Sequence, residues 1–213
     1  MDASENPRQF LARCLERGRL LIGEVLLEQD FSLRHAKDAS LHDLTIHTDP
    51  IDAREIARYD GEGNFRPLKS APNLRRGWLL QAGSLEGMEL ALEFLYPAAL
   101  GLCVSWMRGT LHPTPLRETL NRQTGMFRIT QLLSDQQARG LIQSHCTSAG
   151  GCLRSILWQM APGVAIMDMP PYKHALIKLQ DDRIPLICRE ACSLLIAAAR
   201  PIAKENLPKK EGA

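Results

Sequence analysis

The stretch at residues 134–152 reads SDQQARGLIQSHCTSAGGC, and it organises the C-terminal half of the chain. Ser134 followed three residues later by Gln137 is a capping box, in which each side chain hydrogen-bonds the backbone of the other residue. This pair predicts a helix that begins here and delivers Cys146 just past its end. Two adjacent glycines let the next loop bend tightly before Cys152. The stretch therefore predicts two thiols, one at a helix end and one closing a short loop.

A second pair of cysteines completes the pattern Cys-x5-Cys, 35 residues, Cys-x3-Cys. Pro185 suits a first helical turn, and residues 186–200 predict a helix that ends before Pro201. Cys188 and Cys192 would then lie four residues apart on one helix face, with their Cβ atoms about 6 Å apart. Two thiolates placed in this way can reach one metal centre.

The spacing of the four cysteines favours an iron–sulfur cluster. Structural zinc sites use cysteine pairs separated by two to four residues, and the first pair here is separated by five. A four-iron cluster is held by four thiolates spread over a wider span. The sequence therefore predicts a [4Fe–4S] cluster on Cys146, Cys152, Cys188 and Cys192. Zinc, or four thiols without metal, are the alternatives, although the polar neighbours of Cys146 argue against a simple core role.

Other residues near the pattern have weaker signals. Arg154 and Arg189 each lie within two residues of a cysteine, where a guanidinium would favour the more negative, reduced cluster, or would simply be solvated. His145 could replace a thiol as a ligand, but four thiols already suffice. Trp158 could shield the cluster, although a core role is the simpler interpretation. Cys14 and Cys103 both lie in apolar helical stretches, which predicts buried thiols without chemistry.

The N-terminal part predicts a mixed α/β domain. Asn6-Pro7 and Ser84 are helix-start signals, and alternating apolar residues mark the strands. We expect helices at 7–17, 50–58, 85–96 and 98–107, and strands at 20–27, 31–35, 44–47 and 77–82. The whole chain is thus expected to be α+β, with an N-terminal mixed α/β domain at 1–124 and a mainly helical cluster-binding domain at 125–213, divided near Thr124-Gly125.

A group of three histidines and three aspartates near the N-terminus could in principle hold a metal. Polar residues at strand edges and loops explain the spacing better. The group comprises His35, Asp38, His42, Asp43, His47 and Asp49.

The bulk composition excludes several classes of protein. Hydrophobic residues make up 45% and charged residues 23%, as in ordinary globular proteins, and the net charge of +2 is too small to indicate nucleic-acid binding. The longest apolar run, Ala98–Met107, is about half a membrane span. With no signal peptide visible, we expect a cytoplasmic protein that binds neither membrane nor nucleic acid, with a homodimer left open.

Two resemblances follow from these motifs. The cysteine spacing is similar to that of sulfite and nitrite reductases, but the flanking residues differ, so the similarity implies shared cluster geometry and not shared catalysis. Most of the chain resembles the C-terminal half of a sirohydrochlorin-chelatase-like family. The matching stretches are Leu33-Arg34-His35, Phe65-Arg66-Pro67-Leu68, Gly77-Trp78, Tyr96-Pro97-Ala98, Gly151-Cys152-Leu153 and Cys188-Arg189-Glu190-Ala191-Cys192.

The second resemblance implies a stabilising domain followed by a [4Fe–4S] cluster-binding domain, with the four cysteines above as ligands. It also implies that the chelatase lobes are absent from this sequence. The leading hypothesis is electron transfer or redox sensing, linked to tetrapyrrole or cobalamin metabolism, with a redox partner or a chelatase-type protein. A catalytic iron–sulfur or tetrapyrrole enzyme, and a zinc-stapled interaction module, remain as alternatives, so the sequence leaves open whether the protein is an enzyme.

Overall fold

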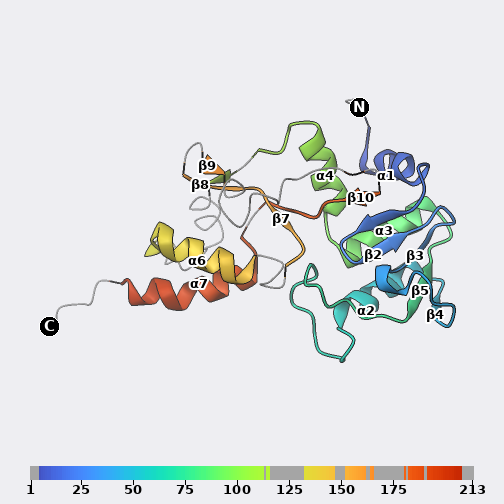
Figure 1. Ribbon diagram of the computed structural model, residues 1–213, viewed down its shortest axis with the longest axis horizontal. Coiled ribbons are helices and arrows are strands. Elements are labelled where there is room, and N and C mark those ends of the chain that lie inside the picture. The colour runs from blue at the N-terminus through green and yellow to red at the C-terminus, as the bar shows by residue number, and fades with distance from the viewer. Residues whose placement is uncertain are drawn as a thin grey trace. The chain divides into compact units, whose positions relative to one another are not determined.

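The computed structural model describes residues 5–112, 114–115, 132–146, 152–161, 164–165, 180, 182–189 and 191–207. The chain divides into two units. Unit 1 comprises Met1–His112 and Ile177–Ile187, and unit 2 comprises Pro113–Leu176 and Cys188–Ala213. The chain therefore leaves unit 1, forms most of unit 2, returns to unit 1 for a short segment and ends in unit 2 (Figure 1). The predicted division at Thr124-Gly125 lies outside the described residues and stays a prediction.

Unit 1 contains a six-stranded mixed sheet with the order β10-β1-β2-β3-β5-β4. Neighbouring strands from β1 to β5 are antiparallel, while β4 is parallel to β5 and β10 is parallel to β1. The strands are β1 (Leu20–Ile22), β2 (Val25–Leu27), β3 (Ser32–His35), β4 (Thr45–His47), β5 (Trp78–Gln81) and β10 (Arg183–Ile184). The edge strand β10 comes from far along the chain, and the Leu21 N–H donates to the Asp182 carbonyl at 2.8 Å.

The single strand predicted at 20–27 is a hairpin in the structure. Gly23 has φ +59°, a left-handed conformation that favours glycine, so the chain turns between β1 and β2. The ring of Tyr96 closes over this turn, and the Glu24 N–H donates to the Tyr96 hydroxyl at 2.8 Å. A Cβ added at Gly23 would lie 2.5 Å from the ring, so both the backbone angle and the tight packing require glycine.

The helices of unit 1 follow the predicted start signals. Asn6 and Gln9 form a capping box at the start of α1, and the Ser84 side chain accepts from the Gly87 N–H at the start of α3. Helix α1 packs against α3 and α4, and α2 packs against α3. The helices are α1 (Pro7–Leu15), α2 (Ala53–Arg58), α3 (Leu85–Leu95) and α4 (Ala99–Met107), with single 3₁₀ turns η1 (Ala36–Asp38) and η2 (Pro50–Asp52).

The histidines and aspartates of residues 35–49 serve the fold. His35 is buried, with its Nε2 atom 3.5 Å from the Glu24 carboxylate and its Nδ1 accepting from the Lys37 N–H. Asp38 is fully buried and accepts from the Arg76 side chain and the Gly77 N–H, each at 2.7 Å. Among the described residues, no three His, Cys, Asp or Glu side chains form a group suited to a single metal ion.

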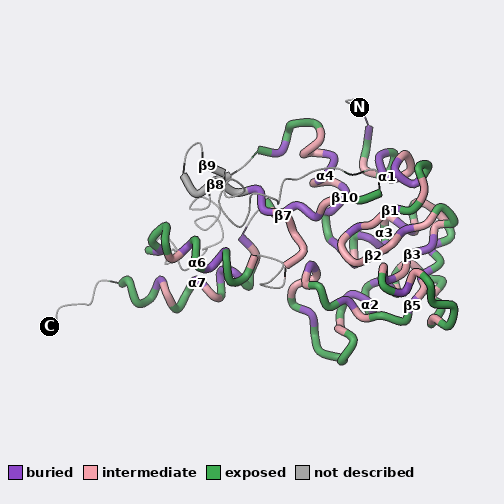
Figure 2. Tube along the Cα trace, in the orientation of Figure 1, coloured by how far each residue is buried: buried purple, intermediate pink, exposed green. Residues whose placement is uncertain are grey.

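The described part of unit 2 combines two helices with short strands. Helices α6 (Asp135–His145) and α7 (Ser193–Glu205) pack side by side along a shared apolar stripe, with their outer faces exposed (Figure 2). Strands β6 (Thr114–Pro115), β8 (Trp158–Ala161) and β9 (Val164–Ala165) form one sheet, and β7 (Ser155–Ile156) and β11 (Ile187–Cys188) form another. The mixed α/β character of the chain is thus confirmed.

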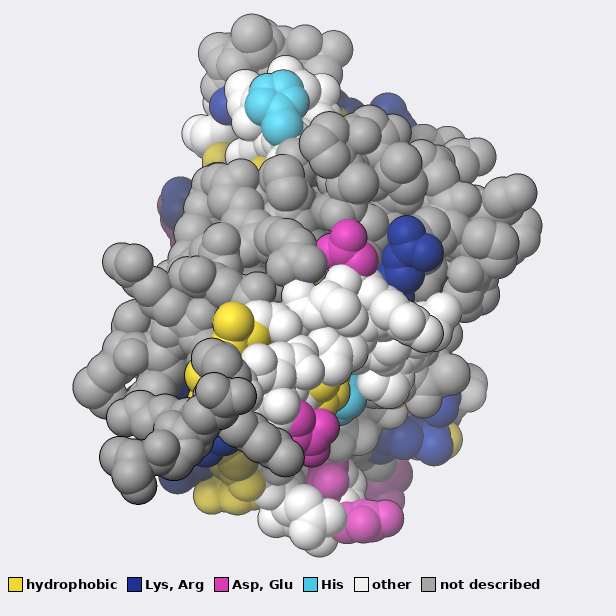
Figure 3. All heavy atoms as spheres, turned by 90° about the vertical axis from the view of Figure 1, so that its left-hand side faces the viewer, with side chains coloured by type: hydrophobic (Ala, Val, Ile, Leu, Met, Phe, Trp, Pro, Cys, Tyr) yellow, Lys and Arg dark blue, Asp and Glu magenta, His cyan; other side chains and the backbone are white. Residues whose placement is uncertain are grey.

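Within the described part of the chain, no individual helix has the length and apolar character to cross a membrane. Helices α3 and α4 meet those criteria only as a pair, and they meet at a 99° bend. On the face drawn in Figure 3, the acidic and basic side chains that are coloured lie interspersed and do not gather by sign.

Candidate metal centre

Helix α6 places Cys146 as its sequence predicts. The Gln137 N–H donates to the Ser134 hydroxyl at 3.2 Å, and the Ser134 N–H donates to the Gln137 side chain at 2.9 Å, so the capping box is complete. The helix ends at His145, and the N–H of Cys146 still donates to the Ile142 carbonyl at 2.8 Å. The Cys146 thiol is therefore fixed at the C-terminal end of a well-defined helix.

The predicted helix at 186–200 is wrong in its first half. Ile187–Cys188 is a strand that pairs with β7, and the Leu157 N–H donates to the Cys188 carbonyl at 2.9 Å. Cys192 has extended backbone angles and is the N-cap of α7. The two cysteines therefore do not share a helix face, because non-local strand pairing overrides the local helix preference.

The predicted end of this helix is also wrong. Pro201 lies inside α7, which continues to Glu205. The buried residues of α7 include Ala199 before the proline and Ala203 after it, so the packed stripe passes through Pro201. Packing of an apolar face supplies most of the stability of a helix in a protein, and here it carries the helix past a residue that removes one hydrogen bond.

The four cysteines of the predicted site gather in unit 2. None of the four forms a disulfide, and all four are half-buried. Cys146, Cys188 and Cys192 pack against the same apolar core, between α6 and α7. Burial raises the pKa of the Cys146 thiol, and negative charge on Cys188, Cys152 and Cys192 raises it further. The shared apolar core and the electrostatic influence on Cys146 are both consistent with four neighbouring thiols.

A single metal ion needs a tighter group of ligands than a four-iron cluster does. Tetrahedral zinc, with bonds of about 2.3 Å, would bring its sulfur ligands to within roughly 4 Å of one another. No three of the described His, Cys, Asp and Glu side chains form such a group. Four cysteine thiols are the ligands that a four-iron cluster takes.

The neighbours of the cysteines take ordinary positions. The His145 Nδ1 atom lies 2.7 Å from the Ser144 hydroxyl and 3.1 Å from the Leu141 carbonyl, so the ring turns back along α6. A histidine in the last turn of a helix suits the negative end of the helix dipole. Arg154 is half-buried and Arg189 is exposed, while the side chain of Trp158 lies outside the described residues.

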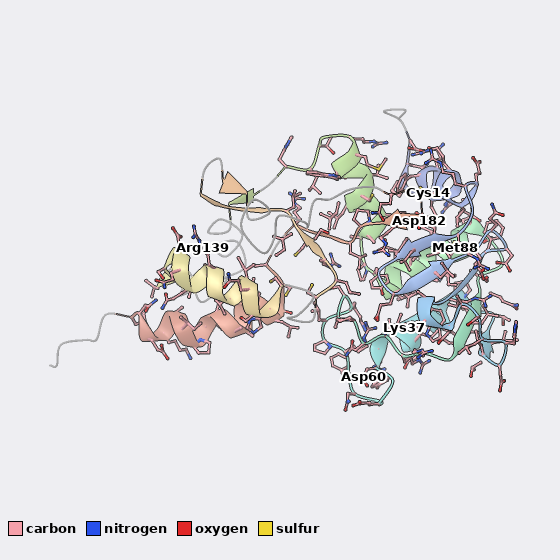
Figure 4. The ribbon with its side chains drawn as sticks, viewed as in Figure 1. Cys14, Lys37, Asp60, Met88, Arg139 and Asp182 are labelled. Carbon is pink, nitrogen blue, oxygen red and sulfur yellow. The ribbon has the colours of Figure 1, made fainter. Side chains whose placement is uncertain are left out.

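The two remaining cysteines are core residues of unit 1, as predicted. Cys14, labelled in Figure 4, is buried on α1. Cys103 is buried on α4, with its sulfur 3.8 Å from that of Met107. Burial raises the pKa of Cys103 to about 12, which keeps this thiol protonated. Neither residue belongs to the candidate centre.

One feature of the site was not predicted, namely the start of a helix at Cys192. The first N–H groups of a helix have no partners within it and carry partial positive charge. The side chain of Cys192 caps none of them. The signal in the sequence was the step from Cys192-Ser193 to an unbroken apolar run, which resembles a helix start more than a helix interior.

Comparison with known proteins identifies both parts of the chain. Residues 8–106 match the family model described as the DR2241 stabilising domain. Residues 108–201 match the model described as a 4Fe-4S iron-sulfur cluster binding domain. None of the curated proteins compared with the chain matches it.

A solved structure supports the same assignment. The protein is similar to DR2241 from Deinococcus radiodurans, with a TM-score of 0.69 and 29% identity, over 94% of this chain and 42% of that one. DR2241 is described as a multi-domain protein with structural similarity to chelatases and with two additional novel domains. This chain spans less than half the length of that relative. Both the resemblance and the cofactor predicted from the sequence are thereby confirmed, since the chain matches a DR2241 stabilising domain followed by a [4Fe–4S] cluster binding domain and is similar in structure to DR2241.

Proposed function

We propose that Cys146, Cys152, Cys188 and Cys192 hold the [4Fe–4S] cluster and that the protein uses it for electron transfer or redox sensing. The observation that carries the proposal is the gathering of these four half-buried thiols in unit 2. When bound, such a cluster supplies one-electron redox chemistry. Four protein thiolates would leave no iron open to a substrate, and this favours an electron carrier or sensor over a catalyst.

The surrounding residues suit a cluster that gains negative charge. Cys192 stands at the positive end of α7, and the half-buried Arg154 is two residues from Cys152. Both features favour the reduced form, because they stabilise added negative charge. The apolar residues of α6 and α7 that pack against three of the four cysteines exclude water.

The test is anaerobic purification followed by quantification of iron, sulfide and zinc. We expect about four irons and four sulfides per chain, the composition of this cluster type, and a broad absorption that dithionite bleaches. Replacing any one of the four cysteines by serine should cost most of the bound iron. Cys14→Ala and Cys103→Ala are matched controls, since both thiols are buried outside the centre, and these variants should retain full iron content.

Two outcomes would contradict the proposal. A requirement for only three of the four cysteines would leave one iron without a thiolate and would favour catalysis. Stoichiometric zinc in colourless protein would favour a structural metal and remove the redox role.

A second proposal concerns the cellular role of the protein. The relative DR2241 is described as chelatase-like beside its two additional domains. We propose that the cluster unit of this protein also works with a chelatase-type region, in the same polypeptide or a separate one, in tetrapyrrole or cobalamin metabolism. Titration of the cluster-loaded protein with sirohydrochlorin, monitored by the absorption of both chromophores, tests this link. Unchanged spectra at all ratios would remove it.

A further inference from the structure

A cavity of about 430 Å³ opens on unit 1. Its walls come from three segments: the exposed face of α2, the last turn of α3, and the loop that joins α2 to β5. The residues used below are Arg54, Arg58, Phe65, Lys69, Glu93 and Phe94. The sequence did not predict this cavity, because its lining residues come together only when the three segments pack.

The lining is strongly basic. Arg54 and Arg58 are four residues apart on α2 and so share one face. Lys69 adds a third cation, with its ammonium donating to the Ala57 carbonyl at 2.9 Å. The one acidic lining residue among those described, Glu93, already accepts from the Ala98 N–H at 3.0 Å. Arg58 also pairs with Glu55 at 3.4 Å, so three cations lie beside two carboxylates, and one of these carboxylates is engaged with the backbone.

A buried guanidinium lies behind this lining. Arg66 is only 1% exposed, and its partners are neutral oxygens: Asn73 Oδ1 at 2.8 Å, the Lys69 carbonyl at 2.9 Å and the Ala71 carbonyl at 3.0 Å. No described carboxylate forms an ion pair with it. Burial lowers the pKa of Lys69, and the charges of Arg66 and Arg58 lower it further, while the charge of Glu55 acts in the opposite direction.

The loop that carries this charge is held in one shape. Asp60, labelled at the turn of the loop in Figure 4, accepts from the N–H groups of Glu62 and Asn64 at 3.0 and 2.8 Å. Tyr59 and Phe65 form an antiparallel bridge that closes the loop, and Arg66 ties the next residues to α2. The site is therefore built before a ligand arrives, which lowers the entropic cost of binding.

Two aromatic rings complete the lining. Phe65 is 62% exposed at the end of the closed loop, and Phe94 is half-buried on α3. The Lys69 ammonium lies 6.0 Å from the centre of the Phe65 ring. Cations beside exposed aromatic faces suit a ligand that has acid groups on a flat, unsaturated body.

We propose that this cavity binds a small anionic ligand with a flat, unsaturated ring. Its acid groups meet Arg54, Arg58 and Lys69, and its ring lies against Phe65 and Phe94. A phosphate and a carboxylate share the chemistry that these cations recognise. The ring requirement separates this site from a merely basic surface, and the cavity volume falls in the range of small-molecule sites.

The test compares four probes by isothermal titration calorimetry on the full, cluster-loaded chain. ATP without metal carries a ring and phosphates, and benzene-1,3,5-tricarboxylate carries a ring and carboxylates. Tripolyphosphate has the charge without the ring, and adenosine has the ring without the charge. We expect at least one ring-bearing anion to bind about tenfold more tightly than either single-feature probe, which is about 1.4 kcal/mol. Which of the two binds better distinguishes phosphate from carboxylate recognition.

Variants separate the two contributions. Arg54 is exposed and has no hydrogen bond or ion pair with another described residue, so Arg54→Gln should fold normally and weaken binding about tenfold. Phe65→Leu keeps apolar bulk and removes the flat ring, and it should weaken binding about fivefold. Arg139→Gln on α6, labelled in Figure 4, makes the same charge change outside the cavity and should leave binding unchanged.

Three results would overturn the proposal. One is failure of both ring-bearing anions to bind more tightly than tripolyphosphate and adenosine. The second is unchanged affinity in Phe65→Leu. The third is equal weakening in Arg54→Gln and Arg139→Gln, which would show a general effect of charge.

Discussion

At the scale of single residues, the fold of unit 1 depends on a few positions that are sensitive to substitution. Gly23 is one, since its left-handed backbone turns the first hairpin directly under the Tyr96 ring. Glu24 follows it and joins the hairpin to the buried His35 and to the Leu74 N–H. Both positions lie in unit 1, whereas the four cysteines of the candidate centre lie in unit 2.

We expect Gly23→Ala to destabilise the protein by about 2–4 kcal/mol, the sum of the strain of a left-handed alanine and a displaced Tyr96 hydrogen bond. Urea unfolding of the metal-free protein measures this change. Gly61→Ala is the matched control, because its added Cβ meets nothing within 4 Å and its φ is not in the left-handed range. Equal midpoints for the two variants would show that the turn tolerates a side chain.

Glu24 predicts a dependence of stability on pH. Burial alone would raise the pKa of this carboxyl, but the hydrogen bonds from His35 and the Leu74 N–H, with the charges of His35 and Arg66, bring the pKa below its ordinary value of 4.5. A carboxyl with a lowered folded pKa stabilises the fold above its unfolded pKa, and the contribution is lost as pH falls through the folded pKa.

We therefore expect the free energy of unfolding to fall below about pH 4.5 more steeply in the wild type than in Glu24→Gln. Unfolding curves at a series of pH values test this, with the exposed Glu16→Gln as the control. The same pH slope for Glu24→Gln and the wild type would contradict the assignment.

At the scale of elements, helix ends position the candidate ligands. Cys146 stands at the C-terminal end of α6 and Cys192 at the N-terminal end of α7. Of these two helix ends, only the N-terminal end of α7 carries the partial positive charge that stabilises a negative cluster. Proline is tolerated at the first position of a helix, where it removes an N–H that has no partner inside the helix. The extended backbone of Cys192, with φ −76° and ψ 165°, is already the conformation that a following proline requires.

We expect Ser193→Pro to lower the reduction potential of the cluster by roughly 10–40 mV, because a helix terminus contributes about 0.3–1 kcal/mol to a nearby charge. Redox titration followed by absorption measures the shift. Asp135→Pro is the matched control, since it removes the same N–H at the start of α6, at the opposite end of that helix from Cys146. A potential equal to that of the wild type in Ser193→Pro would show that α7 does not tune the cluster.

The sequence predicts some helices and strands better than others. Local signals were sufficient for α1, α3 and α6, because a capping box or an N-cap side chain acts within one turn. They failed at Cys188, where pairing with β7 overrides a helical pattern, and at Pro201, where packing continues the helix. The ligands could be proposed from residue type and spacing alone, but the backbone that carries Cys188 could not.

At the scale of the whole molecule, contacts between segments far apart in the sequence were not predicted. Strand β10 pairs with β1 across most of the length of the chain, and nothing in its two residues signals that partner. The basic and aromatic cavity of unit 1 was not predicted for the same reason, because its lining comes from α2, α3 and a loop that are separate in the sequence. Composition and motif spacing are sufficient to predict the type of cofactor. The order of the strands in the sheet and the residues that line the cavity depend on contacts between distant segments, which form only on folding.

The return of residues 177–187 to unit 1 means that the chain passes between its two units three times. No single cut can therefore separate two complete units. A fragment that stops at residue 112 lacks β10 and leaves the outer backbone groups of β1 open to unwanted pairing between molecules. A fragment that starts at residue 113 carries β10 with no sheet to join. Only a rearranged gene that attaches residues 177–187 directly to the first segment would encode a self-sufficient N-terminal half.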